Sequence, residues 1–109
     1  VGLPDMTSES VTATPSPVLV IPVGSFEQHG PHLPLDTDSR IALALSERLV
    51  AALSANAVLG PTITVTASGE HQGFVGTLSI GTQTTARVFE EIARSADWAT
   101  GIVFVNGHG

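Results

Sequence analysis

The stretch "VLVIPV", residues 18–23, decides the fold. It is apolar throughout, mostly β-branched, and lacks the alternation of polar and apolar residues that a half-exposed strand shows. A continuous run of this kind is typical of a strand that is buried on both faces of a parallel sheet. Residues 101–105, "GIVFV", repeat the pattern near the other end of the chain. We therefore expect two buried parallel strands, with Pro22 near the end of the first.

A third apolar run and two helical patterns lie between these strands. Residues 58–66, "VLGPTITVT", predict a strand that Pro61 makes an edge strand or an irregular one. Residues 38–53 predict a helix, with Thr37 or Asp38 as its N-cap. Its expected core-facing stripe recurs every four residues: Ile41, Leu45, Leu49 and Leu53.

A second helix is predicted over residues 84–97. Its apolar stripe consists of Phe89, Ile92, Ala93 and Ala96, and its other face carries the i,i+4 pairs Arg87–Glu91 and Glu90–Arg94. The order strand, helix, strand, helix, strand predicts an α/β fold with a mostly parallel sheet and right-handed crossovers.

Composition limits the possible functions. The chain has 109 residues, 42% of them hydrophobic, which suits one small domain or part of a larger one. Its net charge of −6 and lack of lysine argue against nucleic acid or anionic membranes as partners. The absence of cysteine excludes disulfides, thiolate metal sites and a cysteine nucleophile, and a cytoplasmic location fits. No apolar run approaches the roughly 18–20 residues of a membrane-spanning helix.

The two ends of the chain have distinct characters. Residues 1–17 are rich in Ser, Thr and Pro and predict a flexible arm. Residues 18–109 then form an α/β domain, which ends on a predicted strand and a glycine-containing loop with no helix to cover them. We expect this domain to be the N-terminal part of a longer one that continues beyond Gly109.

All four histidines lie in loops that follow the three predicted strands. These loops are "GSFEQHGPHLPLDTD" (24–38), "SGEHQGFVGT" (68–77) and "NGHG" (106–109). Ligands of α/β sheets bind beyond the carboxyl ends of the strands, so the loops mark one candidate site.

The first loop has the composition of a metal site. Glu27 and His29 are two residues apart and project to the same side of an extended segment. Asp38 follows after a turn that Gly30 and two prolines shape. Carboxylates and imidazole together suit Zn²⁺, Mn²⁺ or Fe²⁺. A hydrogen-bonded surface cluster, in which Asp36 or Asp38 only caps the helix, would give the same pattern.

The other loops add candidates with simpler alternatives. His108 lies between two glycines, Gly107 and Gly109, and either joins the ligands or is hydrogen-bonded within a turn. Ser68, Glu70 and His71 could contact a substrate or merely form a turn, and His32 could simply orient the proline-rich loop. The sequence contains no G-x-S-x-G elbow, no phosphate-binding loop with its lysine and no G-x-G-x-x-G opening a helix.

The stretches "PVGSFEQHGPHLPLDTD", "GEHQGFVGT" and "VNGHG", in this order and spacing, resemble the creatininase (creatinine amidohydrolase) family. The resemblance covers residues 18–109, which correspond to about the first half of a typical member. It implies a three-layer αβα fold, metal-dependent amide hydrolysis and a homo-oligomer, usually a hexamer. Within the family, "ASGEHQGF" and "SIGT" are most similar to the peptidase branch of the mycofactocin system. This implies release of the modified C-terminal dipeptide core from a precursor peptide.

The resemblance also assigns roles by matching motifs. Glu27, Asp38 and His108 correspond to ligands of one divalent metal ion, and His29 and Asp38 to ligands of a second, with Asp38 bridging. The remaining carboxylate ligand and the proton-transfer histidine are expected beyond Gly109, so no catalytic residue is named. The groups expected around the metals or substrate are His32, Ser68, Glu70 and His71.

Two alternatives remain open at this stage. The chain could serve another activity of the family, such as creatinine ring opening or formamide hydrolysis. It could also be a non-catalytic metal-binding or assembly subunit. If the metal site exists, the ligand atoms of its four candidate residues should converge: Glu27, His29, Asp38 and His108.

Overall fold

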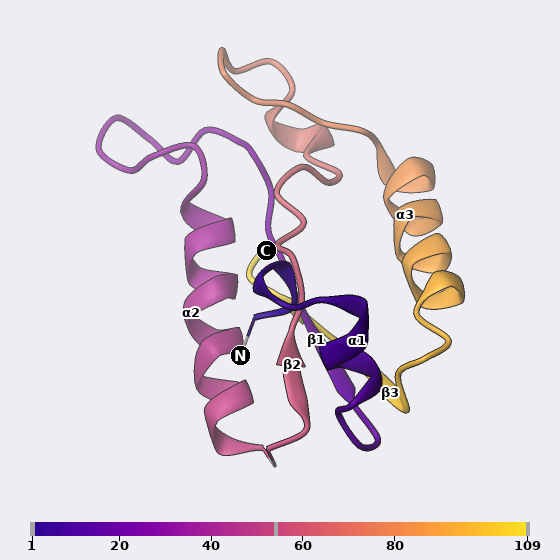
Figure 1. Cartoon of the computed structure of the whole chain (residues 1–109). Coiled ribbons are helices and arrows are strands. Elements are labelled where there is room, and N and C mark those ends of the chain that lie inside the picture. The colour runs from indigo at the N-terminus through magenta and orange to yellow at the C-terminus, as the bar shows by residue number, and fades with distance from the viewer. Residues whose placement is uncertain (1, 54, 109) are drawn as a thin grey trace.

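A computed structural model of the protein describes residues 2–53 and 55–108. Three parallel strands form one sheet in the order β2-β1-β3, namely β1 (Val18–Val23), β2 (Ala57–Leu59) and β3 (Gly101–Asn106). The helices α2 (Thr37–Ala52) and α3 (Thr82–Ser95) lie on opposite sides of this sheet (Figure 1). The predicted α/β class with αβα layers is therefore confirmed.

The central strand is β1, as its unbroken apolar sequence predicts. Leu19, Val20 and Ile21 are buried, and hydrogen-bonded strands flank them on both sides. β3 differs from the prediction. It lies at the edge of the described sheet and is only partly buried, with Val103 38% exposed. No strand among the described residues pairs with its outer side.

The second strand is shorter than the predicted 58–66. β2 ends at Leu59, and pairing with β1 returns only as a single bridge between Ile63 and Val23. Pro61 lies in the gap, where it has no N–H to donate to a ladder. The prediction of an irregular edge strand is confirmed, but its length was wrong.

The helix α2 packs on the sheet through a different face from the predicted one. Ile41 and Leu45 of the expected stripe are 47% and 49% exposed. The buried residues are instead mostly small: Asp38, Ser39, Ala42 and Ser46. The cause is the close approach of α2 to two glycines at the ends of β1 and β3. A Cβ on Gly24 would collide with Ser39, and one on Gly107 would lie 2.5 Å from the backbone oxygen of Asp38. Leucine side chains do not fit into this contact.

The N-cap of α2 is Asp36, one residue before the predicted Thr37. Its side chain makes no capping bond and pairs with Arg40 instead, Nε to Oδ1 at 2.8 Å. Asp38 therefore lies in the first turn of the helix and is not its N-cap, so its side chain can make other contacts.

The helix α3 covers the other face of the sheet. The ring centroids of Phe89 and Phe104 are 4.9 Å apart, and Ile92 packs against a core cluster that contains Ala96. Ala93 is exposed, contrary to prediction. The two predicted ion pairs of its outer face are present, at 3.3 Å (Arg87–Glu91) and 3.2 Å (Glu90–Arg94).

The N-terminal segment contains two short helices. It holds a 3-10 helix, η1 (Leu3–Asp5), and a short helix, α1 (Ser8–Thr12), whose capping box uses Thr7 and Ser10. Leu3 packs against the core, and Gly2 bridges to Leu59. Independent motion of this segment stays a prediction. Within the described ranges, no helix has both the length and the apolarity to cross a membrane.

Candidate metal centre

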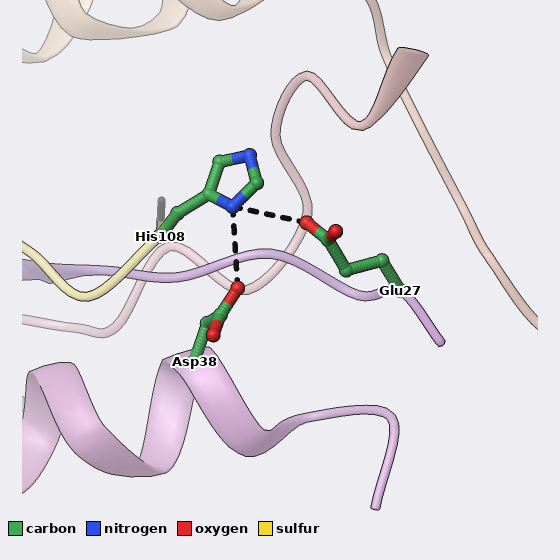
Figure 2. A group of neighbouring side chains, drawn as sticks. All are labelled: Glu27, Asp38 and His108. Atoms are coloured by element: carbon green, nitrogen blue, oxygen red, sulfur yellow. Dashed lines mark hydrogen bonds and ion pairs between the residues drawn. The ribbon is translucent and has the colours of Figure 1, made fainter. Parts of the chain in front are cut away.

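The strand order creates an opening at the carboxyl ends of β1 and β3. The chain leaves β1 toward one side, through α2 to β2, and reaches β3 on the other side through α3. The loops after these two adjacent strands begin side by side at the carboxyl edge of the sheet, which is where α/β sheets bind ligands. Figure 2 shows what meets there: Glu27 from the loop after β1, Asp38 from the first turn of α2, and His108 from the loop after β3.

The tautomer of His108 follows from its neighbours. Its Nε2 lies 2.9 Å from the backbone oxygen of Ala67, which can only accept, so Nε2 carries the proton. The other ring nitrogen, Nδ1, faces two carboxylates, at 3.0 Å from Glu27 Oε1 and 3.2 Å from Asp38 Oδ2 (Figure 2). Three acceptor atoms thus converge in a largely buried place. Such an arrangement requires a cation between them, either a proton or a metal ion.

The predicted loop "NGHG" is described only as far as His108. The N–H of Gly107 donates to the backbone oxygen of Val23 at 2.8 Å, which fixes the start of the loop beside the end of β1. Gly109, the second of the two predicted flanking glycines, lies outside the described residues. The carboxylate ligand and the proton-transfer histidine that the resemblance implies beyond Gly109 therefore stay predictions.

His29 has the same arrangement as His108. Its Nδ1 donates to the backbone oxygen of Glu27 at 3.0 Å, and its Nε2 faces Asp38 Oδ1 at 2.9 Å. The hydrogen bond to the Glu27 carbonyl raises the pKa of His29; burial opposes this rise, and Asp38 adds to it. Asp38 therefore turns one oxygen to His29 and the other to His108.

Asp38 is kept ionised by its partners. Burial alone would raise the pKa of this carboxyl, but hydrogen bonds from Ser25 and His29 outweigh that effect and lower it. Ser25 is fully buried, and its hydroxyl donates to Asp38 Oδ2 at 2.6 Å. The sequence interpretation missed Ser25. Its position directly after Gly24 at the end of β1 was the available signal.

Glu27 is only 2% exposed and is held by the second loop. Ser68 donates to its Oε1 at 3.2 Å, and His71 Nε2 lies 2.7 Å from its Oε2. His71 belongs to a 3-10 turn, η2 (Gly69–His71). The structure thus brings both predicted neighbours to the site. Glu70 is largely exposed, and its Oε1 lies 4.0 Å from His71 Nε2.

His32 and Gln28 differ from the sequence expectations. His32 is exposed, and no hydrogen bond or ion pair with another described residue places it at the site. Gln28 was not singled out, yet its Nε2 lies 2.9 Å from His71 Nδ1. The only feature of the sequence that could have indicated Gln28 is its position directly after the candidate ligand Glu27.

The four candidate ligands border an open cavity of about 450 Å³. Its remaining lining residues are Gln28, Gly30, Glu70 and His71. The donor set of carboxylate oxygens and imidazole nitrogens fits Zn²⁺, Mn²⁺ or Fe²⁺. A larger cavity of about 630 Å³, between α1 and Trp98, is lined by no ionisable side chain. Of these two cavities, the smaller one therefore carries the ionisable side chains that could bind a metal ion.

The chain matches a family model described as creatininase, creatinine amidohydrolase, over residues 4–109. The chain belongs to the creatininase family. It is 51% identical over 112 aligned residues to the mycofactocin precursor peptide peptidase of Mycobacterium tuberculosis. The protein of the same name from Mycolicibacterium smegmatis is 53% identical over 98 residues. These alignments cover 94% and 85% of the chain, but only 44% and 40% of the relatives, so the chain spans less than half of their length.

Solved creatininases share the fold. A creatinine amidohydrolase structure has a TM-score of 0.88 at 26% identity, with 99% of this chain and 45% of that chain covered. A creatininase titled as an Mn form has a TM-score of 0.79 at 28% identity, over 99% of this chain and 45% of that one. A mutant creatininase titled as a Zn-Zn type gives 0.74 at 29% identity, over 97% and 44%. The Mn and Zn named for these two creatininases are metals that carboxylate and imidazole donors, such as those of the present chain, can bind.

Proposed function

We propose that the full-length protein is a metal-dependent hydrolase that cleaves a C–N amide bond in a peptide. One observation carries this proposal. Nε2 of His29 and Nδ1 of His108 face the two oxygens of Asp38, while backbone carbonyls accept hydrogen bonds from the opposite ring nitrogens. Backbone carbonyls orient metal-binding histidines in this way.

The proposed site would hold two divalent ions. Glu27 Oε1, Asp38 Oδ2 and His108 Nδ1 would bind one, and His29 Nε2 and Asp38 Oδ1 the other. A bound ion of this kind supplies Lewis acidity and lowers the pKa of a water from about 15.7 toward about 7. Other groups of the protein would orient the metal ligands. Ser25 holds the Asp38 carboxylate, and the carbonyl of Ala67 fixes the ring of His108. Zn²⁺, Mn²⁺ and Fe²⁺ all suit this donor set.

The proposed substrate is a mycofactocin-type precursor peptide, from which the modified C-terminal dipeptide core is released. The relatives with 51% and 53% identity carry the name of a peptidase acting on that precursor, whereas the creatininase structures are only 26–29% identical. The open cavity that borders the candidate ligands is where this substrate would bind. We also propose that the protein is cytoplasmic and that it forms a homo-oligomer, namely a hexamer.

A matched pair of variants tests the proposal in the full-length protein. Asp38→Asn removes the proposed bridging carboxylate, and Asp36→Asn is its control, because the Asp36 carboxylate pairs with Arg40 at the surface. We expect cleavage of the precursor peptide to require a divalent ion, to be lost in Asp38→Asn and to persist in Asp36→Asn.

Three other results would contradict this function. Cleavage that survives chelation rules out metal-dependent hydrolysis. Turnover of creatinine or a formamide without peptide cleavage assigns another activity of the family. Stoichiometric metal binding with no hydrolysis of any of these substrates identifies a binding or assembly subunit.

A further inference from the structure

The orientation of the Gln28 amide is set by a backbone donor. The N–H of Gly30 donates to Gln28 Oε1 at 3.0 Å. Because a backbone N–H can only donate, the amide oxygen must face Gly30 and the amide nitrogen must face the other way. That nitrogen, Nε2, lies 2.9 Å from His71 Nδ1.

This orientation determines the tautomer of His71. The Gln28 Nε2 group can only donate, so His71 Nδ1 must accept and is unprotonated. The ring proton then lies on Nε2, which points to Glu27 Oε2 at 2.7 Å. His71 therefore presents a fixed N–H to the site, whereas the site-facing nitrogens of His29 and His108 face carboxylates and can exchange a proton for a metal ion. Three histidines line one cavity, and only two of them have the tautomer of a metal ligand.

The His71 tautomer gives the two carboxylate oxygens of Glu27 different partners. Its Oε2 accepts the His71 N–H, while its Oε1 faces His108 and accepts from Ser68. The carboxylate is buried, so these contacts lie away from water, where hydrogen bonds to a charged group are strong. With one oxygen occupied by His71, only the other is available to an ion.

We propose that Gln28 and His71 form a positioning relay that makes Glu27 a metal ligand through Oε1 alone. His71 is a positioning residue in this relay and does not bind metal. The inference rests on the proposed metal site. It also opposes a second arrangement, in which Glu27, Glu70 and His71 hold an additional ion, since their ligand atoms lie within 4.8 Å of one another.

Metal affinity of the full-length protein, measured by competition with a chelator using Zn²⁺, tests the relay. His71→Leu removes the donor to Glu27, and we expect affinity to fall about 10–100-fold, as for other residues that orient metal ligands. His71→Gln restores an amide donor and should recover part of the loss. Gln28→Leu should weaken binding in the wild type but have no further effect in a His71→Leu background, because Gln28 acts only through His71.

Stoichiometry and the imidazole spectrum complete the test. Glu70→Gln should keep both affinity and the number of bound ions, and ¹⁵N NMR of the metal-free protein should show His71 protonated at Nε2. Loss of one bound ion in both Glu70→Gln and His71→Leu would overturn the relay in favour of the additional ion. Additive effects of the Gln28 and His71 changes, or a proton on Nδ1, would also overturn it. Failure of the wild type to bind Zn²⁺ would instead refute the proposed function.

Discussion

His29 Nε2 lies 2.9 Å from Asp38 Oδ1, and the pKa of each residue is shifted toward its charged form. The pKa of His29 is raised above 6.5, so in metal-free protein its contribution to stability is fully present below pH 6.5 and lost as pH rises through the folded pKa. The pKa of Asp38 is lowered below 3.8, so its contribution is present above pH 3.8 and lost as pH falls through the folded pKa.

The first prediction follows from these signs. The stability that this contact gives to metal-free protein should be greatest between about pH 3.8 and 6.5 and should decline above 6.5. A saturating divalent ion replaces the proton and should suppress that decline, because metal binding displaces the proton from the imidazole. Thermal unfolding across pH, with and without Zn²⁺, measures both effects. His29→Asn should abolish the decline and the exposed His32→Asn should keep it; an identical profile in both variants would contradict the assignment.

The second prediction concerns the buried hydroxyl of Ser25. Ser25→Ala removes the 2.6 Å hydrogen bond to Asp38 Oδ2, which is a bond to a charged group worth about 1.5–3 kcal/mol. Metal affinity should therefore fall about 10–100-fold, measured by chelator competition. Ser46→Ala is the control, because Ser46 Oγ is buried without a hydrogen-bond partner among the described residues. This change should leave affinity unaltered and stability equal or higher. Equal affinity losses in the two variants would show a general packing effect.

The sequence predicted the strands and the convergence of the candidate ligands better than the packing of α2. The run at residues 18–23 indicates a buried strand because a buried parallel strand needs apolar residues at every position. Periodicity also located α2, but its Leu and Ile stripe indicated the wrong buried face. The deciding residues, Gly24 and Gly107, lie outside the helix, and their close contact with it depends on the tertiary structure.

In the candidate site too, some features could be predicted from the sequence and others depend on the tertiary structure. Glu27, His29, Asp38 and His108 were recognised from residue type, loop position and a resemblance to a family. The roles of Ser25 and Gln28 depend on which atom faces which, and residue order does not contain that information. Each became apparent only through its contact with a neighbour of fixed donor or acceptor character: Asp38 for Ser25, Gly30 for Gln28.

The third prediction is that metal removal destabilises the protein. Without a cation, Glu27 Oε1, Asp38 Oδ2 and His108 Nδ1 face one another as three acceptors. Chelation should lower the melting temperature, and Zn²⁺ or Mn²⁺ should restore it. At a free ion concentration about 100 times the Kd, the gain is about 2.7 kcal/mol. Asp38→Asn should melt at the same temperature with and without the ion. If neither chelator nor metal changes the wild-type melting temperature, ion binding at these residues is ruled out.

The fourth prediction connects the packing of α2 to the site. A Cβ at position 107 would lie 2.5 Å from the backbone oxygen of Asp38 and 2.9 Å from the backbone nitrogen of Ala42. Backbone atoms of a helix cannot move singly, so Gly107→Ala should displace the first turn of α2, which carries Asp38. Overpacking of this kind costs about 1–3 kcal/mol, and metal affinity should fall with stability because Asp38 moves away from His108.

Gly101→Ala, at the other end of the same strand, is the matched control for Gly107→Ala. A Cβ at Gly101 meets no atom within 4 Å, so stability should stay within about 0.5 kcal/mol of wild type and metal affinity should not change. Urea unfolding and chelator competition on both variants separate the cases. If Gly107→Ala is destabilised but binds Zn²⁺ with wild-type affinity, the close contact serves only the fold. If both properties decline together, the glycine at the end of β3 is what allows Asp38 to reach His108.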